Sequence, residues 1–272
     1  MNIDPIFDLS GSVALVTGGS RGLGREMVLA FAARGADVVI ASRKIETCEA
    51  VAGEVRALGR RAMAYSVHAA RWPELDAMVE HVYAEWGRID ILVNNAGMSP
   101  AVASHDVTES LFDSVLGLNF KGPFRLATQV AKRMYDGSGG VIINVSSSGA
   151  LMPLPAVVPY GSAKAALNAM TRSLAAEYGP RVRVNTLSPG PFLPTSRRRG
   201  PTRHVSMPAT RSGARAGLKR SLPLRSSWPA PRRRSPPARR SASMAACRRG
   251  CSPVGSAANR RQEAGTASCV PR

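Results

Sequence analysis

The sequence predicts an α/β fold in which a doubly wound parallel sheet carries helices on both faces, giving three layers. Two observations carry this prediction. Short and almost wholly apolar runs recur along residues 13–187, and a stretch with the helical spacing of apolar residues follows nearly every run. Strands of this kind are buried on both faces, and a regular alternation of strand and helix is typical of parallel sheets.

The first half of the predicted sheet has three strands. They are expected at 13–16, 38–41 and 62–67, where apolar residues follow one another with few interruptions. Helices are expected between them at 26–34 and 45–58, because apolar residues recur there at helical spacing and a glycine follows each stretch.

The second half continues the same alternation. Strands are expected at 89–93, 141–145 and 182–187, and helices at 75–86, 111–134 and 160–178. We find no internal repeat, and the predicted sheet stops after its sixth strand.

Charge is distributed very unevenly along the chain. Residues 195–272 contain 19 of the 37 Lys and Arg but only one of the 18 Asp and Glu, so they carry +18 of the formal net charge of +19. This region is rich in Arg, Ser and Pro, and Trp228 is its one aromatic residue. We therefore expect a folded domain over 1–193 and a disordered basic tail over 194–272.

Composition excludes several classes of protein. Residues 1–193 hold one cysteine, Cys48, which excludes a disulfide framework there and favours a reducing, cytoplasmic location. The tail cysteines lack the spacing of a zinc site, so no metal is expected. No apolar run reaches the roughly 18 residues that a membrane span needs, and the first ten residues do not resemble a secretory signal.

A glycine-rich turn, Thr17 to Gly24, joins the first expected strand to the first helix. Glycines let a backbone approach a pyrophosphate, and a helix N-terminus offers free N–H groups and a positive dipole end. The second strand ends at Ser42, where an acidic residue would bind the ribose of NAD. Arg21 and Arg43 flank this region instead and suit a 2′-phosphate, which favours NADP; the alternative is two solvated surface arginines.

Tyr160 and Lys164 lie four residues apart and so on one face of an expected helix. A phenol titrates near pKa ~10, and a nearby ammonium lowers that value towards the pH at which proton transfer is efficient. Ser147 follows the fifth strand, where its hydroxyl could hydrogen-bond a substrate carbonyl. Taken alone, the pair would be an exposed Tyr and Lys on an ordinary helix, and any of the three consecutive serines part of a plain turn.

Together these elements resemble the short-chain dehydrogenase/reductase family in its classical form. The matching motifs stand in order: the turn at 17–24, Asn94-Asn95-Ala96-Gly97 after the fourth strand, Asn119, Ser147, Tyr160, Lys164, and Pro189-Gly190 after the sixth strand. The resemblance covers roughly residues 8–193. It implies a Rossmann-type fold and hydride transfer between NADP(H) and a ketone or secondary alcohol, for example an oxoacyl or sugar compound.

The resemblance also implies a role for each matching residue. Tyr160 would be the general acid in reduction, and Lys164 would lower its pKa and hold the nicotinamide ribose. Ser147 would polarise the carbonyl, and Asn119, at a helix irregularity, would help to hold the water chain that resupplies protons. The residues implied in cofactor binding besides Tyr160 and Lys164 are Gly18, Ser20, Arg21, Gly22, Leu23, Gly24, Ser42, Arg43, Asn94, Ala96, Gly97, Pro189 and Gly190. Asn94 and Ala96 would line the adenosine side, and Pro189-Gly190 the nicotinamide side.

One position departs from the family pattern. An Asp usually follows the third strand and contacts the adenine amino group, and counting back from Asn94 places His68 there. A neutral imidazole has only one acceptor, so adenine binding would be altered unless a backbone contact suffices.

The tail after Leu193 lacks the family's last helix and strand, and three interpretations compete. A nucleic-acid-binding extension has the charge but no stacking platform and no binding motif, so nucleic acid is not the expected partner. A plain disordered tail leaves the missing end of the enzyme unexplained. A displaced reading frame, the interpretation that we favour, explains both.

The displaced frame can be checked on the codons. Read one base earlier, Trp228-Pro229 permits the family's Leu-Ala, residues 234–238 permit Phe-Thr-Thr-Gly, and residues 244–246 permit Asp-Gly-Gly. One A restored before Pro194 turns residues 193–196 into Leu-Thr-Asp-Ile.

We therefore expect weak or absent activity, because the lost elements support the sheet and often a homo-oligomer interface in this family. Sequencing the gene decides the matter.

Overall fold

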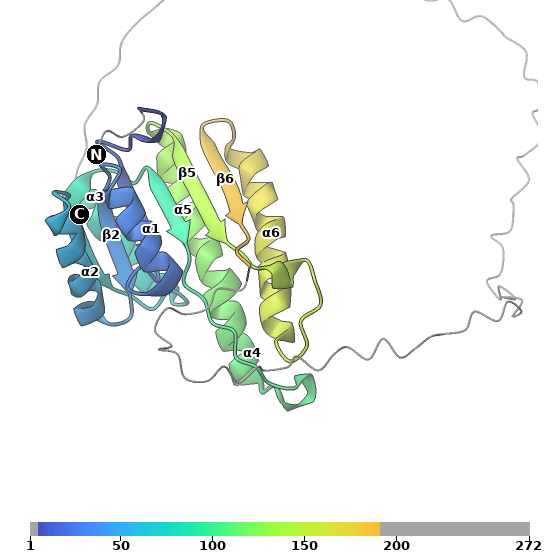
Figure 1. Cartoon of the computed structure of the whole chain (residues 1–272). Helices are drawn as coiled ribbons and strands as arrows, with labels where there is room; N and C mark the ends of the chain where they lie inside the picture. The colour runs from blue at the N-terminus through green and yellow to red at the C-terminus, as the bar shows by residue number, and fades with distance from the viewer. Residues whose placement is uncertain (1–4, 191–272) are drawn as a thin grey trace, which may run out of the picture. The chain divides into compact units, whose positions relative to one another are not determined.

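The computed structural model describes residues 5–190 of the chain, drawn in colour in Figure 1. Residues 1–4 and 191–272 lie outside the described part. The boundary expected at residue 193, the tail over 194–272 and its reading-frame interpretation therefore fall outside the described residues.

Within residues 5–190, six parallel strands form one sheet in the order β3-β2-β1-β4-β5-β6 (Figure 1). Their bounds are Val13–Thr17 for β1, Asp37–Ser42 for β2, Ala62–Ser66 for β3, Ile91–Asn94 for β4, Gly140–Val145 for β5 and Val182–Leu187 for β6. The order reverses between β1 and β4, because the chain leaves β3 at one edge and returns on the far side of β1. The predicted doubly wound sheet is confirmed, and ligands of such sheets bind beyond the strand ends at this reversal.

Six α-helices connect the strands in the part of the chain that the structure describes. Their bounds are Gly22–Ala32 for α1, Ile45–Ala57 for α2, Trp72–Trp86 for α3, Glu109–Leu116 for α4, Gly122–Asp136 for α5 and Val158–Tyr178 for α6. Single 3₁₀ turns lie at Pro5–Phe7 (η1), Ser104–Asp106 (η2) and Ser148–Ala150 (η4). None of the helices in the described part is both long and apolar enough to cross a membrane.

The helix expected at 111–134 is present, but a π-helical turn, η3 (Gly117–Lys121), interrupts its regular winding between α4 and α5. Asn119 lies within this turn, and its side chain donates to the carbonyl oxygen of Val115, four residues earlier. A side chain inserted among backbone carbonyls is a usual cause of such an irregularity. The irregularity that the family resemblance placed at Asn119 is thereby confirmed.

The core lies in two layers, one on each face of the sheet. Val13 and Leu15 belong to the apolar cluster that α3, α5 and α6 cover, whereas Ala14 and Val16 belong to the cluster that α1 and α2 cover. Successive strand residues point to opposite faces, so a strand buried on both faces must be apolar at every position. This requirement explains the uninterrupted apolar run of β1.

Candidate active site

The turn after β1 takes its shape from glycines. Gly18 has a φ of +65° and Gly22 a φ of +55°, a backbone region that favours glycine. A Cβ on Gly24 would lie 2.2 Å from the carbonyl oxygen of Gly18, so a larger residue does not fit there. The N-terminus of α1 has no side-chain cap and no acidic residue in its first turn. The turn therefore leaves backbone N–H groups and a positive dipole end for an anion such as a pyrophosphate.

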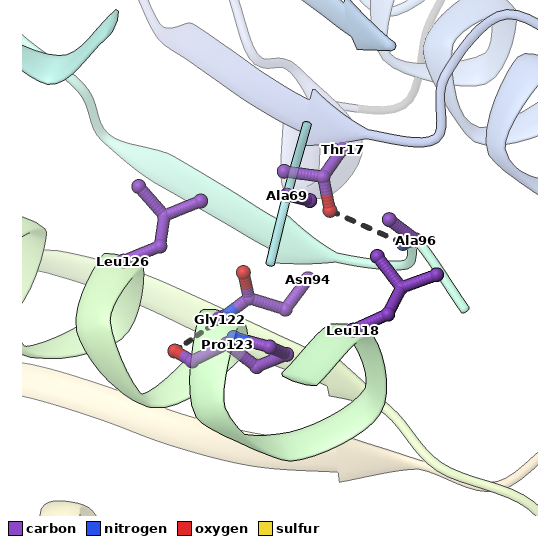
Figure 2. Close-up of a pocket in the computed structure, with 8 residues that line it drawn as sticks. All are labelled: Thr17, Ala69, Asn94, Ala96, Leu118, Gly122, Pro123 and Leu126. Atoms are coloured by element: carbon purple, nitrogen blue, oxygen red, sulfur yellow. Dashed lines mark hydrogen bonds between the residues drawn. The ribbon is translucent and has the colours of Figure 1, made fainter. Parts of the chain in front are cut away.

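Two residues to which the sequence reading gave no role hold this turn against the end of β4. Thr17 Oγ1 accepts from the backbone N–H of Asn95 at 3.0 Å and of Ala96 at 3.2 Å. The Asn95 amide donates to the carbonyl oxygens of Thr17 at 2.9 Å and Gly18 at 3.2 Å. Figure 2 shows the bond between Thr17 and Ala96. Both residues stand inside matching motifs, but only the fold brings residues 17 and 95 together.

The crevice in Figure 2 lies where η3 and α5 pack beneath the ends of β1 and β4. It is lined by Thr17, Ala69, Asn94, Ala96, Leu118, Gly122, Pro123 and Leu126. The crevice has no room for a water molecule, so it is a packing contact and not a substrate pocket. Gly122 permits the contact, because a Cβ at that position would lie 1.8 Å from the carbonyl oxygen of Ala69.

The glycine turn also meets the end of β2. The hydroxyl of Ser20 donates to the hydroxyl of Ser42 at 3.1 Å, which brings the neighbouring Arg21 and Arg43 to the same end of the sheet. Both arginines are exposed, and neither forms an ion pair with another described residue. Exposed arginines without ion pairs agree with a 2′-phosphate site and equally with the alternative of two solvated surface arginines, so the preference for NADP stays a prediction.

Lys164 is buried beside Tyr160, which contradicts the alternative of an exposed pair. The lysine is 3% exposed, its Nζ donates to the carbonyl oxygen of Val145 at 2.8 Å, and Nζ lies 5.8 Å from the centroid of the Tyr160 ring. Burial lowers the pKa of Lys164 from 10.5 to about 8, because a desolvated ammonium is less stable than a solvated one. Tyr160 is half-buried in the first turn of α6.

Asn119 faces the same region from η3. Its Nδ2 donates to the carbonyl oxygens of Met98 and Val115, both at 2.9 Å, while its buried Oδ1 has no partner among the described residues. A Cβ on Gly97 would lie 2.7 Å from Asn119 Oδ1 and 3.7 Å from Lys164 Nζ. The lack of a side chain at Gly97 therefore leaves space between these two polar atoms. A buried carbonyl oxygen requires a donor, and the water that the resemblance implies would be one.

The three consecutive serines have different environments. Ser146 is buried and its hydroxyl donates to the carbonyl oxygen of Lys164 at 3.4 Å. Ser147 is half-buried, and its Oγ accepts from the N–H of Gly149 at 3.1 Å, so its own proton remains available to a carbonyl. A Cβ on Gly161 would lie 3.0 Å from the carbonyl oxygen of Gly149, which shows how closely η4 packs beside the residue that follows Tyr160.

Asn94 has a structural side chain. Its Nδ2 donates to Asn144 Oδ1 at 2.9 Å and to the carbonyl oxygen of Pro123 at 3.4 Å, the latter drawn in Figure 2. Asn144 in turn donates to Thr171 Oγ1 at 2.9 Å, so the amides connect β4, β5 and α6. The place expected for Asn94 beside an adenosine stays a prediction and would rest on its backbone.

Pro189 and Gly190 follow β6 at the end of the described chain. The N–H of Ser146 donates to the carbonyl oxygen of Leu187 at 2.8 Å, which places the end of β6 next to the serine turn. The fold thus brings the predicted site residues to the carboxyl edge of the sheet. Within the described part, no group of three or more His, Cys, Asp or Glu is placed to hold a metal ion.

This arrangement defines a class of protein, and comparison with known proteins agrees. The chain belongs to the short-chain dehydrogenase family, whose model, described as short chain dehydrogenase, matches residues 12–203. The chain is 36% identical over 190 residues to D-threitol dehydrogenase of Mycolicibacterium smegmatis, an alignment that covers 70% of this chain and 73% of that protein. It is therefore an NAD(P)-dependent oxidoreductase of this family.

Two solved structures similar to this chain contain different cofactors. A metagenomic short-chain oxidoreductase in complex with NADP is 34% identical, with a TM-score of 0.65, and the match covers 68% of this chain and 84% of that one. A xylitol dehydrogenase bound to NAD⁺ is 30% identical, with a TM-score of 0.64, and the match covers 66% of this chain and 70% of that one. Both dinucleotides therefore occur among its structural relatives.

Proposed function

We propose that this protein transfers a hydride between NADP(H) and a ketone or secondary alcohol, with Tyr160 as the proton donor in reduction. The observation that carries the proposal is the buried amine of Lys164, 5.8 Å from the ring centroid of Tyr160. Burying an amine lowers its pKa and costs stability, and such perturbed groups concentrate at functional sites. Below a pH of about 8 the amine is an ammonium that favours the phenolate left after proton transfer.

The cofactor would lie across the carboxyl ends of the strands. The backbone N–H groups of the glycine turn would hold its pyrophosphate, and Arg21 and Arg43 would hold the 2′-phosphate of NADP. Lys164 would bind the nicotinamide ribose. When bound, the nicotinamide supplies or accepts the hydride, and the protein supplies orientation and the proton.

Three of this chain's residues would handle the carbonyl and its proton. Ser147 would donate a hydrogen bond to the carbonyl oxygen, which polarises the carbonyl and sets its orientation. Tyr160 would then give its hydroxyl proton to that oxygen. Asn119 Oδ1, which has no partner in the described part, faces the space at Gly97, where a water would return a proton towards Lys164.

The proposal includes a small carbonyl or alcohol compound as the partner and does not include nucleic acid. The cytoplasmic location expected from the sparse cysteines remains part of the proposal. The displaced reading frame is also part of the proposal. It would remove the residues of a homo-oligomer interface, and we therefore expect this chain to catalyse the reaction slowly.

Replacement of Tyr160 by Phe tests the proposal. We expect Tyr160→Phe to lower the rate of NADPH-dependent reduction by about 10²–10⁴-fold, because it removes the general acid. Binding of NADPH, followed by the change in its fluorescence, should stay within about twofold, because the ring remains. Rates are measured with the purified full chain on a panel of ketones, aldehydes and polyols.

Tyr135→Phe is the matched control. Tyr135 is exposed near the end of α5, where its ring contacts Tyr178, and the substitution should leave the rate unchanged. Equal rates for Tyr160→Phe and the unmodified protein would contradict the proposed role. No binding of either NADPH or NADH would contradict the proposed function itself.

A further inference from the structure

A continuous series of contacts leads from the glycine turn to the end of β3. Ser20 in the turn bonds to Ser42 at the end of β2, and Ser42 accepts from the N–H of Val67 at 2.9 Å. His68 follows Val67 directly and is the first ionisable residue beyond β3. A dinucleotide whose pyrophosphate lies on the turn has its ribose at the end of β2. The purine base, one step further from the pyrophosphate, would therefore lie near the end of β3 and His68.

The imidazole of His68 has a fixed orientation and a fixed donor. The backbone N–H of Ala70 donates to His68 Nδ1 at 3.3 Å, and the backbone N–H of His68 donates to Glu74 Oε2 at 2.7 Å. Because Nδ1 acts as an acceptor, the ring proton lies on Nε2. Nε2 makes no hydrogen bond to another described residue and remains available to a ligand as a donor.

We propose that His68 determines which purine base the cofactor site prefers. It presents an N–H donor at a position where an acceptor would select adenine. The site should therefore bind 6-oxopurine dinucleotides at least as well as adenine dinucleotides. The inference rests on the dinucleotide binding proposed above. It concerns this chain's own residue and the base of the cofactor, and it is separate from the hydride chemistry.

The chemistry of the two bases gives the direction of the effect. Adenine carries an amino donor at C6, whereas hypoxanthine, like guanine, carries a carbonyl acceptor there. A carboxylate can only accept, so it selects the amino group, whereas the Nε2–H of His68 can only donate. Where the C6 substituent faces Nε2, adenine presents a second donor and forms no hydrogen bond with His68, whereas hypoxanthine forms one.

The test compares binding of two pairs of cofactors by calorimetry with the purified full chain. One pair is NADP⁺ and nicotinamide hypoxanthine dinucleotide phosphate, and the other is NAD⁺ and nicotinamide hypoxanthine dinucleotide. Using both pairs separates the effect of the base from that of the 2′-phosphate. We expect each hypoxanthine form to bind as tightly as its adenine partner or more tightly.

Substitutions at position 68 should move this ratio in a defined way. His68→Asp should shift it towards adenine by about tenfold, the worth of one hydrogen bond to a charged acceptor. His68→Ala should give an intermediate ratio and carries the test if the carboxylate beside Glu74 prevents folding. His105→Asp is the matched control, because His105 is exposed in η2 and should leave the ratio unchanged.

Three results would overturn the inference. The first is a clear preference of the unmodified protein for adenine in both pairs, and the second is a ratio that neither variant at position 68 changes. The third is the absence of binding by all four dinucleotides, which overturns the proposed function and this inference together. The first two leave dinucleotide binding intact, so the two failures can be told apart.

Discussion

The central strand β1 and its neighbour β2 differ from the edge strand β6 in how they are buried. All five residues of β1 are buried, and β2 is buried at every position except its two ends. In β6 only Val182 and Val184 are buried, and Leu187 is 44% exposed. Among the described helices, α3, α5 and α6 cover one face of the sheet, whereas the cluster on the other face takes its helical residues from α1 and α2.

This difference separates the two tasks of the proposed site. The glycine turn stands at the end of β1, in the part of the sheet that helices cover on both faces. The serine turn, Tyr160 and Lys164 adjoin β5 and β6, where the described helices cover one face. We therefore expect dinucleotide binding to tolerate more damage at the β6 end than carbonyl reduction does.

The largest effect should come from adding a side chain at Gly122, where α5 packs closely against the backbone of Ala69. Gly122→Ala would place a methyl group 1.8 Å from the backbone oxygen of Ala69, which cannot move as a side chain end would. We expect a loss of about 4 kcal/mol in the free energy of unfolding, or failure to fold. Gly53→Ala is the control. Its Cβ in α2 meets nothing within 4 Å, so it should stabilise by about 0.5–1 kcal/mol in urea denaturation.

The second prediction tests the difference in burial between β1 and β6 directly. Leu15 in β1 is 0% exposed and Leu187 in β6 is 44% exposed. Leu15→Ala should cost about 3 kcal/mol because it leaves a cavity, and Leu187→Ala less than about 1 kcal/mol because solvent fills the space. Urea denaturation of both variants gives the difference. An equal loss of unfolding free energy for both variants would show that Leu187 is buried in solution and that β1 and β6 do not differ in burial.

The third effect concerns Lys164, whose pKa in the folded chain, about 8, is below its ordinary value of 10.5. Between these pH values the unfolded chain holds a proton that the folded chain has released, so stability rises with pH. The rise should reach about 3 kcal/mol between pH 8 and 10.5. Lys164→Met should lack it, whereas Lys132→Met, which removes an exposed lysine paired with Asp136, should keep it. Unfolding free energies at four pH values test this. Parallel profiles for Lys164→Met and the unmodified protein would contradict it.

Much of the fold was predictable because burial on two faces leaves a pattern in the sequence. The apolar runs of β1, β2 and β4 placed their strands to within two residues of the observed ends. Periodicity predicted the helix at 111–134 but not its π-helical turn, because the spacing of apolar residues does not register one extra backbone residue in a turn. The family resemblance placed an irregularity at Asn119, which periodicity alone did not show.

The site was predictable in its residue types and less so in its contacts. Motif spacing marked Tyr160, Lys164 and the glycine turn, since residues close in sequence share a helix face or a turn. The roles of Thr17 and Asn95 were missed, because their bonds join β1 and β4 across more than seventy intervening residues. The tautomer of His68 was equally hidden, because it depends on the position of a single backbone N–H group.

The sequence by itself determined the α/β class, the order of the elements and the residues available for chemistry, because these follow from local periodicity and composition. Only the tertiary structure decided that Lys164 is buried, that Asn119 Oδ1 has no partner in the described part and that β6 is covered on one face. Burial and hydrogen bonding depend on which distant segments pack together. Packing acts between residues far apart in the chain, so no window of sequence contains it.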